Sequence, residues 1–263
     1  MEFEFVPVDY DYFDHGGRNY VRLIGRNGKG EKVCVVDSYE PNFYLILKDG
    51  ADADKIVKKI SKISVEKGSR VTKIEKTEIL DKKYLGKDVK AIRVYVTNHK
   101  DAHDVASEIG DMDEIEKRRE YDVPIITKYI KENGVEPLKW YTVDAEAEEE
   151  WMMDDIDCFR AKKISLVSEQ KKFVPKILAY DIETSEREIG KGEILMVSLV
   201  GEGIRKVLTW KKCKGAGDYV EFFDDEADML EKFVEYVNDY GPDVLTGYFS
   251  DGFDLPYLKA RAD

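Results

Sequence analysis

Apolar and polar residues alternate along the first forty positions of the chain. Three such runs are separated by glycines at 16–17 and at 28 and 30, and they cover Glu2–Val6, Tyr20–Ile24 and Lys32–Val36. Successive side chains of a strand point to opposite faces, so alternation of this kind indicates strands with one buried face. The pattern predicts a small antiparallel sheet with tight turns.

From position 42 to 121 the pattern changes to strand, helix, strand, strand, helix, strand. The apolar residues Ile56, Ile60 and Ile63 recur at near-helical spacing. This order is that of the ferredoxin-like βαββαβ arrangement. The expected strands are Phe43–Leu47, Val71–Thr77, Ala91–Thr97 and Ile115–Tyr121, and the expected helices are Ala53–Val65, Asp101–Ile109 and a short one over Pro124–Glu132.

A second unit begins near Val174. Its helix over Glu226–Asn238 has Asp224 or Asp225 as the candidate N-cap, and another helix starts at Asp254. A mixed sheet of this kind, with acidic strand ends, matches the ribonuclease-H-like plan, so the fold class is α+β. The expected strands are Ile177–Ile182, Ile194–Val200, Lys206–Trp210 and Val244–Thr246.

Composition separates the two units. Residues 144–170 are acidic and contain Trp151-Met152-Met153, which we interpret as an inter-domain connection with an apolar trio that docks on a neighbour. We therefore expect an N-terminal domain over 1–140, an acidic connecting segment over 141–172 and a partial ribonuclease-H-like domain over 173–263.

Charge and cysteine content restrict the class of protein. No apolar run reaches membrane-spanning length and no signal-peptide pattern opens the chain, so we expect no membrane partner. Three scattered cysteines suit a reducing, cytoplasmic location. The net charge of −13 counts mildly against nucleic-acid binding, although a nuclease site is itself acidic because metal ions meet the phosphate.

The candidate chemistry lies in three carboxylates. Asp181 and Glu183 are two residues apart at the end of an apolar strand, so they point the same way. Asp254 opens a helix in the segment Gly247–Tyr257. Three carboxylates from two elements can hold divalent metal ions, and paired metal ions cleave phosphodiesters. Two alternatives remain: a solvated strand end for Asp181 and Glu183, and an ordinary N-cap for Asp254.

The motifs LAYDIET, from Leu178, and GYFSDGFDLPYL, from Gly247, resemble the first and second exonuclease motifs of archaeal family B DNA polymerases. The segments EPNFYLIL, YLGKDVKAIRVYV and REYDVPIITKYI resemble that family's N-terminal domain in order and spacing. The resemblance implies the N-terminal portion of such a polymerase, which acts in DNA replication and proofreading.

The resemblance also assigns roles at the second unit. Asp181, Glu183 and Asp254 would be catalytic and would bind Mg²⁺ or Mn²⁺ for hydrolytic removal of a 3′-terminal nucleotide. One metal ion would generate hydroxide and the other would stabilise the leaving oxygen. Substrate contacts would come from Thr184, Phe249 and Phe253, although Thr184 also suits a strand end and Phe253 ordinary core packing. The family often has Asn where this chain has Phe249.

The family's third exonuclease motif, a Tyr and an Asp spaced four apart on a helix that follows the second motif, is absent from this chain. We therefore expect the isolated chain to hydrolyse DNA weakly or not at all. Its partners would be DNA, as single-stranded template and 3′ primer end, and the remaining polymerase domains, in the same parent chain or a split partner.

The N-terminal domain resembles that of archaeal relatives, in which a pocket captures uracil in the template strand. Relatives often have an aromatic residue where this chain has Ile125 and Arg where it has Lys128, and the alternative is that these residues simply pack the domain. A non-catalytic module that binds single-stranded DNA or senses uracil is thus the competing hypothesis, and a nuclease completed by its own dimer is a third. The pocket would be lined by Tyr10, Pro41, Asn42, Ala102, Val123, Pro124, Ile125 and Lys128.

Overall fold

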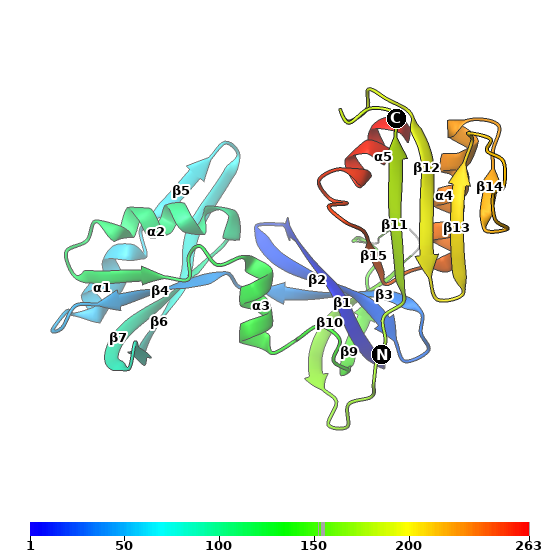
Figure 1. The fold of residues 1–263 in the computed structure, drawn as a ribbon. Helices are drawn as coiled ribbons and strands as arrows, with labels where there is room; N and C mark the ends of the chain where they lie inside the picture. Colours follow the sequence, from blue (N-terminus) through cyan, green and yellow to red (C-terminus); the bar gives the residue numbers. More distant parts are fainter. Residues whose placement is uncertain (152, 154–155, 263) are drawn as a thin grey trace. The chain divides into compact units, whose positions relative to one another are not determined.

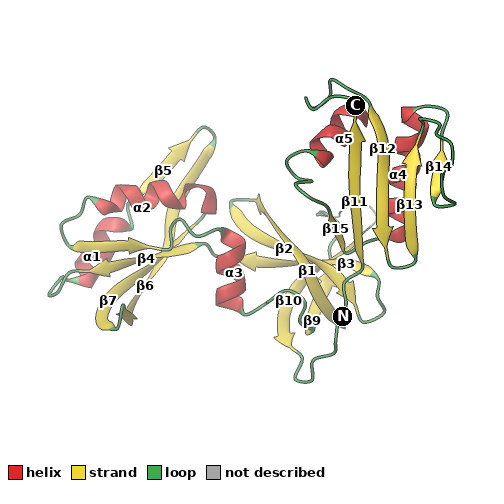
Figure 2. Cartoon of the chain, in the orientation of Figure 1, coloured by secondary structure: helices red, strands yellow, loops and turns green. Residues whose placement is uncertain are grey.

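The structure, a computed structural model, describes residues 1–151, 153 and 156–262. The chain divides into two compact units, Met1–Lys172 and Phe173–Asp263, and each has hydrophobic clusters of its own. Sheets dominate both units (Figures 1 and 2). Of the helices in the described ranges, none combines the length and apolarity needed to span a bilayer.

A closed five-stranded barrel forms one part of the first unit. Its strands follow the order β1-β2-β3-β10-β9 around the barrel. The antiparallel hairpins predicted for the first forty residues are confirmed, and a parallel pair between β10 and β3 closes the barrel. The strands are β1 (Glu2–His15), β2 (Arg18–Asn27), β3 (Lys32–Tyr39), β9 (Tyr141–Ala147) and β10 (Asp157–Leu166).

The predicted connection over 141–172 instead supplies two of these barrel strands. Along β9, Tyr141, Val143 and Ala145 are buried, whereas Asp144 and Glu146 are exposed. The acidic residues that suggested a linker are thus the solvent face of an alternating strand.

Two residues of the apolar trio after β9, Trp151 and Met153, pack within their own unit. Trp151 packs against Phe13 and Tyr20, with ring centroids 5.2 and 4.5 Å away. Met153 is partly buried against the same cluster, while Met152 lies outside the described residues. The contact therefore belongs to the barrel.

The helix α3 (Ile125–Asn133) contributes to the barrel core. Ile125 and Tyr129 are buried there, and Tyr129 donates a hydrogen bond to Asp37 Oδ2 at 2.7 Å. Gly25 faces a bulge in β1, where a Cβ would lie 2.0 Å from the carbonyl oxygen of Val6. Only glycine fits at that position.

The second part of the first unit confirms the βαββαβ prediction. Its antiparallel sheet has the order β5-β6-β7-β4-β8, and α1 and α2 are buried against one face. The predicted helix over Ala53–Val65 ends earlier, because Val65 pairs with Thr72 in a short hairpin. The elements are β4 (Asn42–Leu47), α1 (Ala53–Ile60), β5 (Ser64–Lys67), β6 (Arg70–Tyr84), β7 (Lys87–Val96), η1 (His99–Asp101), α2 (Ala102–Gly110) and β8 (Ile115–Arg119).

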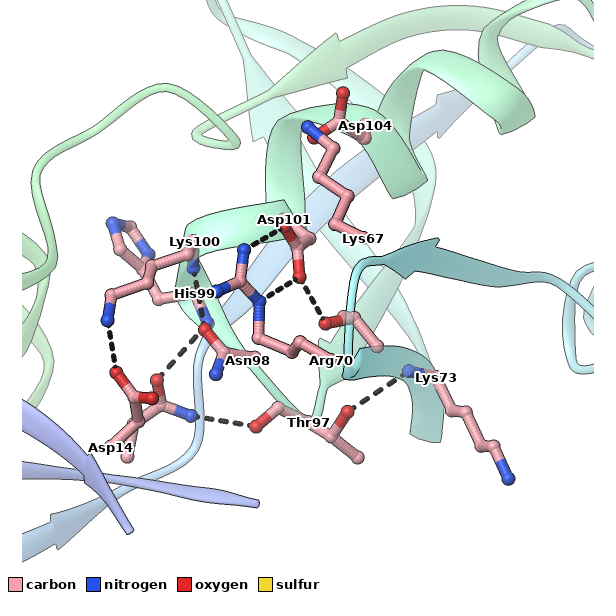
Figure 3. Close-up of polar contacts among 12 residues, drawn as sticks. Asp14, Lys67, Arg70, Lys73, Thr97, Asn98, His99, Lys100, Asp101 and Asp104 are labelled. Carbon is pink, nitrogen blue, oxygen red and sulfur yellow. Dashed lines mark hydrogen bonds and ion pairs between the residues drawn. The ribbon is translucent and has the colours of Figure 1, made fainter.

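Polar contacts anchor the start of α2 to the sheet (Figure 3). Asp101 is fully buried and accepts from Arg70 Nε and Nη2, both at 2.7 Å, and from Thr72 Oγ1 at 2.6 Å. Asn19 of the barrel strand β2 donates to the carbonyl oxygen of Thr97 at 2.8 Å. These bonds tie together segments that are distant in sequence.

The second unit confirms the predicted mixed sheet. Its order is β14-β13-β12-β11-β15, with β11 antiparallel to β12 and parallel to β15. Asp225 caps α4, because its Oδ1 accepts from Asp228 N at 3.0 Å. The short β14 was not predicted. The elements are β11 (Ile177–Thr184), β12 (Ile194–Gly201), β13 (Ile204–Thr209), β14 (Val220–Phe222), α4 (Glu226–Tyr240), β15 (Val244–Thr246) and α5 (Asp254–Ala262).

Candidate active site

The central strand β11 presents two carboxylates on one face. Tyr180 and Ile182 are buried in the core of the second unit, while Asp181 and Glu183 alternate with them and are exposed. Within the described chain, no hydrogen bond or ion pair holds either carboxylate. Both acids are therefore available to a cation.

Asp254 is the first residue of α5 rather than its N-cap. The helix begins at Asp254 itself, and Leu255 N donates to the carbonyl oxygen of Ser250 at 2.9 Å. Asp254 is 3% exposed, and its buried Oδ2 has no hydrogen-bond partner in the described chain. A buried carboxylate oxygen without a partner is costly, and it calls for a specific explanation such as an ion.

Asp254 is coupled electrostatically to one acid of β11, Asp181. Burial raises the pKa of Asp254, and the negative charge of Asp181 raises it further. Burial likewise raises the pKa of Tyr180, with Asp254 contributing in the same direction. The negative charge of Asp181 on β11 therefore acts on the carboxylate that opens α5, although the two acids come from different elements.

The structure does not bring all three predicted carboxylates together. Among the described residues, no group of three or more His, Cys, Asp or Glu side chains is arranged to hold a metal ion. Glu183 lies two residues beyond Asp181, which is roughly 7 Å along an extended strand. Carboxylate oxygens are the ligands that Mg²⁺ and Mn²⁺ prefer, so the donor chemistry fits such ions.

A cleft of about 310 Å³ is lined by residues of the loop before Asp254 and by Leu255, which follows it in the chain. Phe249 has a left-handed φ of 56° and is 71% exposed. Its ring covers Gly252, where a Cβ would lie 2.3 Å from the phenyl carbon Cζ. The cleft is lined by Tyr180, Leu245, Thr246, Gly247, Phe249, Ser250, Asp251, Gly252 and Leu255.

The other two predicted substrate residues have local partners. Thr184 donates its hydroxyl to the carbonyl oxygen of Glu186 at 2.8 Å, as expected of a strand end. Phe253 is partly buried in the core of the unit and packs against Tyr257, with ring centroids 5.4 Å apart. Their predicted contact with a terminal nucleotide stays a prediction.

Sequence reasoning missed two buried hydroxyls at this site. Tyr180 Oη and Ser250 Oγ, like Asp254 Oδ2, are buried without a hydrogen-bond partner in the described chain. Tyr180 looked like plain core in an apolar strand, and Ser250 like a loop residue. Its spacing of four before Asp254 was the only available signal.

Two residues of the predicted uracil pocket meet at α3. Asn42 Nδ2 donates to Glu132 Oε2 at 3.0 Å, and Lys128 Nζ lies 3.7 Å from Glu132 Oε1. Lys128 also donates to Glu120 Oε2 at 2.9 Å. Burial lowers the pKa of Lys128, and Glu120 opposes that shift. Its ammonium group is thus already held by two carboxylates.

The remaining residues of that predicted pocket pack into different parts of the first unit. Tyr10 and Ile125 belong to the barrel cluster, and Tyr10 donates to the carbonyl oxygen of Val135 at 2.9 Å. Ala102 belongs to the ferredoxin-like cluster. Pro41 is buried, Val123 is half-buried and Pro124 is exposed.

The profile of the DNA polymerase family B exonuclease domain matches residues 116–263. The chain belongs to DNA polymerase family B. The resemblance to archaeal members of this family, inferred from the motifs, is confirmed by whole-chain similarity. The DNA polymerase of Pyrococcus glycovorans is 29% identical over 259 residues, and that of Desulfurococcus sp. (strain Tok) is 30% identical over 260 residues. Each alignment covers 97% of this chain and 29% of the relative.

A solved structure supports the same fold for this family B chain. The family B DNA polymerase from the hyperthermophilic archaeon Pyrobaculum calidifontis superposes with a TM-score of 0.77 at 24% identity. The superposition covers 98% of this chain and 32% of that one. The chain thus spans less than a third of the length of these relatives.

Proposed function

We propose that Phe173–Asp263 is the metal-dependent 3′–5′ exonuclease unit of a DNA-directed DNA polymerase. The observation that carries this proposal is the buried, unpartnered Oδ2 of Asp254, which shares its surroundings with the charge of Asp181. Two acids that repel each other at a strand face and a helix start are stabilised by a cation between them. The family profile over this unit supports the same reaction class.

Different side chains of this unit would bind the metal ions and the substrate. Asp181, Glu183 and Asp254 would hold the divalent ions, which when bound supply a hydroxide nucleophile and stabilise the leaving 3′ oxygen. Exposed Phe249 would meet the last base of a single strand beside the cleft, since aromatic rings stack on bases of any sequence. The substrate is then a single-stranded 3′ primer end.

Activity of the isolated chain should be low. In the described residues the charge of Asp181 acts on Asp254, but no set of three acids is arranged around one ion. We infer that further polymerase domains, in a longer chain or a partner, complete the site.

The test is shortening of a 5′-labelled, single-stranded oligonucleotide in Mn²⁺. We expect slow loss of nucleotides from the 3′ end, abolished in Asp181→Asn and Asp254→Asn. Asp239→Asn, which removes an exposed acid near the end of α4, is the matched control and should keep the wild-type rate. Shortening that persists unchanged in Asp181→Asn would contradict the assignment, and rapid degradation would contradict the incomplete site.

A second use, template uracil sensing by the first unit, is supported by the convergence of Asn42 and Lys128 on Glu132. Titration of the chain with matched uracil- and thymine-containing single strands in EDTA decides it. Tighter binding of uracil that Asn42→Ala abolishes is the expected result for a sensor. Equal affinity for the two strands would contradict uracil sensing and would show that Asn42 and Lys128 only pack the first unit.

A further inference from the structure

Three buried oxygen atoms of the second unit lack hydrogen-bond partners. Tyr180 Oη on β11, Ser250 Oγ in the loop before α5 and Asp254 Oδ2 on α5 have none in the part of the chain that the structure describes. The exposed fractions of these residues are 3%, 9% and 3%, so bulk water does not solvate the three oxygens. Across the described residues of Phe173–Asp263, no other buried side-chain nitrogen or oxygen lacks a partner. Native proteins leave few such atoms unpaired, so three from one unit indicate a ligand.

Several contacts connect the two hydroxyls to the start of α5. A Cβ built on Gly247 would lie 2.2 Å from Ser250 Oγ and 2.6 Å from the carbonyl oxygen of Tyr180, so the Ser250 hydroxyl lies against β11. Leu255 N donates to the carbonyl oxygen of Ser250 at 2.9 Å, which ties the loop to the first turn of the helix. Burial raises the pKa of Tyr180, and the charge of Asp254 raises it further, so the phenol experiences the charge of that carboxylate.

Hydroxyl groups suit the surroundings of a hydrated cation. A hydroxyl can accept one hydrogen bond from a water molecule and donate another to a carboxylate oxygen. Mg²⁺ keeps several waters even when one or two carboxylates bind it, and groups outside its ligands orient the ligands and tune the ion. Tyr180 and Ser250 also line the cleft of about 310 Å³, so both residues border the open side of the site.

We propose that Tyr180 and Ser250 are positioning residues whose hydroxyls hold the hydration waters of the cation at Asp254. This inference rests on the proposed function, because it needs a cation at that carboxylate. The acids alone do not enclose an ion, since no group of three is arranged to hold one in the described chain. The two hydroxyls add oxygen groups to the same site. Without the ion they stay buried and unpaired, which costs stability.

The experiment compares Tyr180→Phe and Ser250→Ala with the wild type in two measurements. In calorimetric titration, each variant should bind Mn²⁺ about tenfold more weakly, which is the loss typical of groups that support a metal's ligands. In urea unfolding with EDTA, each midpoint should be no lower than that of the wild type. The reason is that each substitution removes a buried hydroxyl that has no partner in the described chain. A residue that only packs the core would not weaken metal binding while leaving the metal-free fold as stable.

The matched control is Tyr240→Phe, which removes the hydroxyl of another buried tyrosine of the same unit. That hydroxyl has partners, because it donates to the carbonyl oxygen of Ile177 at 3.1 Å and accepts from Glu202 N at 3.0 Å. Its loss should lower the urea midpoint in EDTA and leave the affinity for Mn²⁺ unchanged. The control therefore shows the opposite pattern to Tyr180→Phe.

Failure of this inference and failure of the proposed function give different results. If the wild type does not bind Mn²⁺, or if Asp254→Asn binds it as tightly as the wild type, the proposed function fails and this inference fails with it. If Asp254→Asn loses affinity while Tyr180→Phe or Ser250→Ala keeps it, the cation site stands and this inference is overturned. A midpoint in EDTA below that of the wild type for either hydroxyl variant also overturns it, because the hydroxyl then has a partner without the ion.

Discussion

The carboxylates of Asp181 and Asp254, which come from different elements of the second unit, repel each other. Burial raises the pKa of Asp254, and the charge of Asp181 raises it further. One acid leaves the exposed face of β11 and the other opens α5, with its Oδ2 buried and unpartnered within the described residues. A fold that keeps this arrangement loses stability without a cation and gains it with one.

Asp254→Asn should stabilise the metal-free chain. The substitution removes a buried charge and its repulsion by Asp181, and we expect the free energy of unfolding at neutral pH to rise by about 1 kcal/mol. Because the folded-state pKa lies above the unfolded value, the folded wild type binds more protons, and its stability falls as pH rises from about 4 through the raised pKa. The gain from Asp254→Asn should therefore grow over that window.

The measurement is urea unfolding in EDTA, followed by ¹⁹F NMR of 5-fluorotryptophan at Trp210, the second unit's tryptophan. Asp239→Asn should leave the unfolding midpoint unchanged. If the urea midpoint of Asp254→Asn did not exceed that of the wild type at any pH, the buried charge of Asp254 would not destabilise the fold.

The buried ion pair at the start of α2 should govern acid stability of the first unit. Hydrogen bonds from Arg70, followed by that from Thr72, hold the pKa of Asp101 at about 2 against the opposing effect of burial (Figure 3). A folded-state pKa below the unfolded one gives stability that is present above about pH 4 and lost as pH falls toward 2. Asp101→Asn should lower the free energy of unfolding by about 2 kcal/mol at neutral pH. It should also make the loss of stability between about pH 4 and pH 2 less steep.

Circular dichroism in urea at a series of pH values tests this. The control is Asp81→Asn, an exposed acid on the same sheet, 88% exposed at its side chain. If the free energy of unfolding fell with decreasing pH equally steeply in the wild type and in Asp101→Asn, the role of the ion pair would be contradicted.

Gly247 fixes the loop that carries Ser250 beside Asp254. A Cβ at this position would lie 2.2 Å from Ser250 Oγ and 2.6 Å from the carbonyl oxygen of Tyr180. Gly247→Ala should cost about 2 kcal/mol through overpacking. Adding Ser250→Ala removes the first clash but leaves the backbone one, so it should restore only part of the loss.

Unfolding reported by Trp210 measures both variants. Gly28→Ala, whose Cβ would meet nothing closer than 3.5 Å, is the control and should be near neutral. If the double variant recovered the full free energy of unfolding of the wild type, the backbone of Tyr180 would have moved to relieve the second clash.

Periodicity in the sequence predicted most elements, because apolar spacing reports directly on burial. It did not predict β9, because the exposed acids Asp144 and Glu146 outweighed the alternating buried residues such as Val143 in the composition. It did not predict β10 either, because that strand lies within the range that was assigned to the connecting segment. It did not find β14, a strand of three residues with no pattern of its own. The end of α1 was also misplaced, because pairing of Val65 in a hairpin overrode its helical spacing.

For the site, the spacing of Asp181 and Glu183 correctly predicted a shared exposed face. The positive φ of Phe249 and the burial of Ser250 depend on how the loop closes on β11, which no local pattern encodes. The convergence of all three acids was predicted from their places at a strand end and a helix start and from the family resemblance, and it stays a prediction. Among the described residues the charge of Asp181 acts on Asp254, but no group of three acids is arranged to hold a metal ion.

Calorimetric titration of the chain with Mn²⁺ tests the central claim most directly. If Asp181 and Asp254 form the core of a cation site, the wild type and Asp239→Asn should bind Mn²⁺ with equal affinity. Asp181→Asn and Asp254→Asn should each weaken that binding at least about tenfold, since each removes a charged ligand. Equal Mn²⁺ affinity in all four proteins would contradict the account.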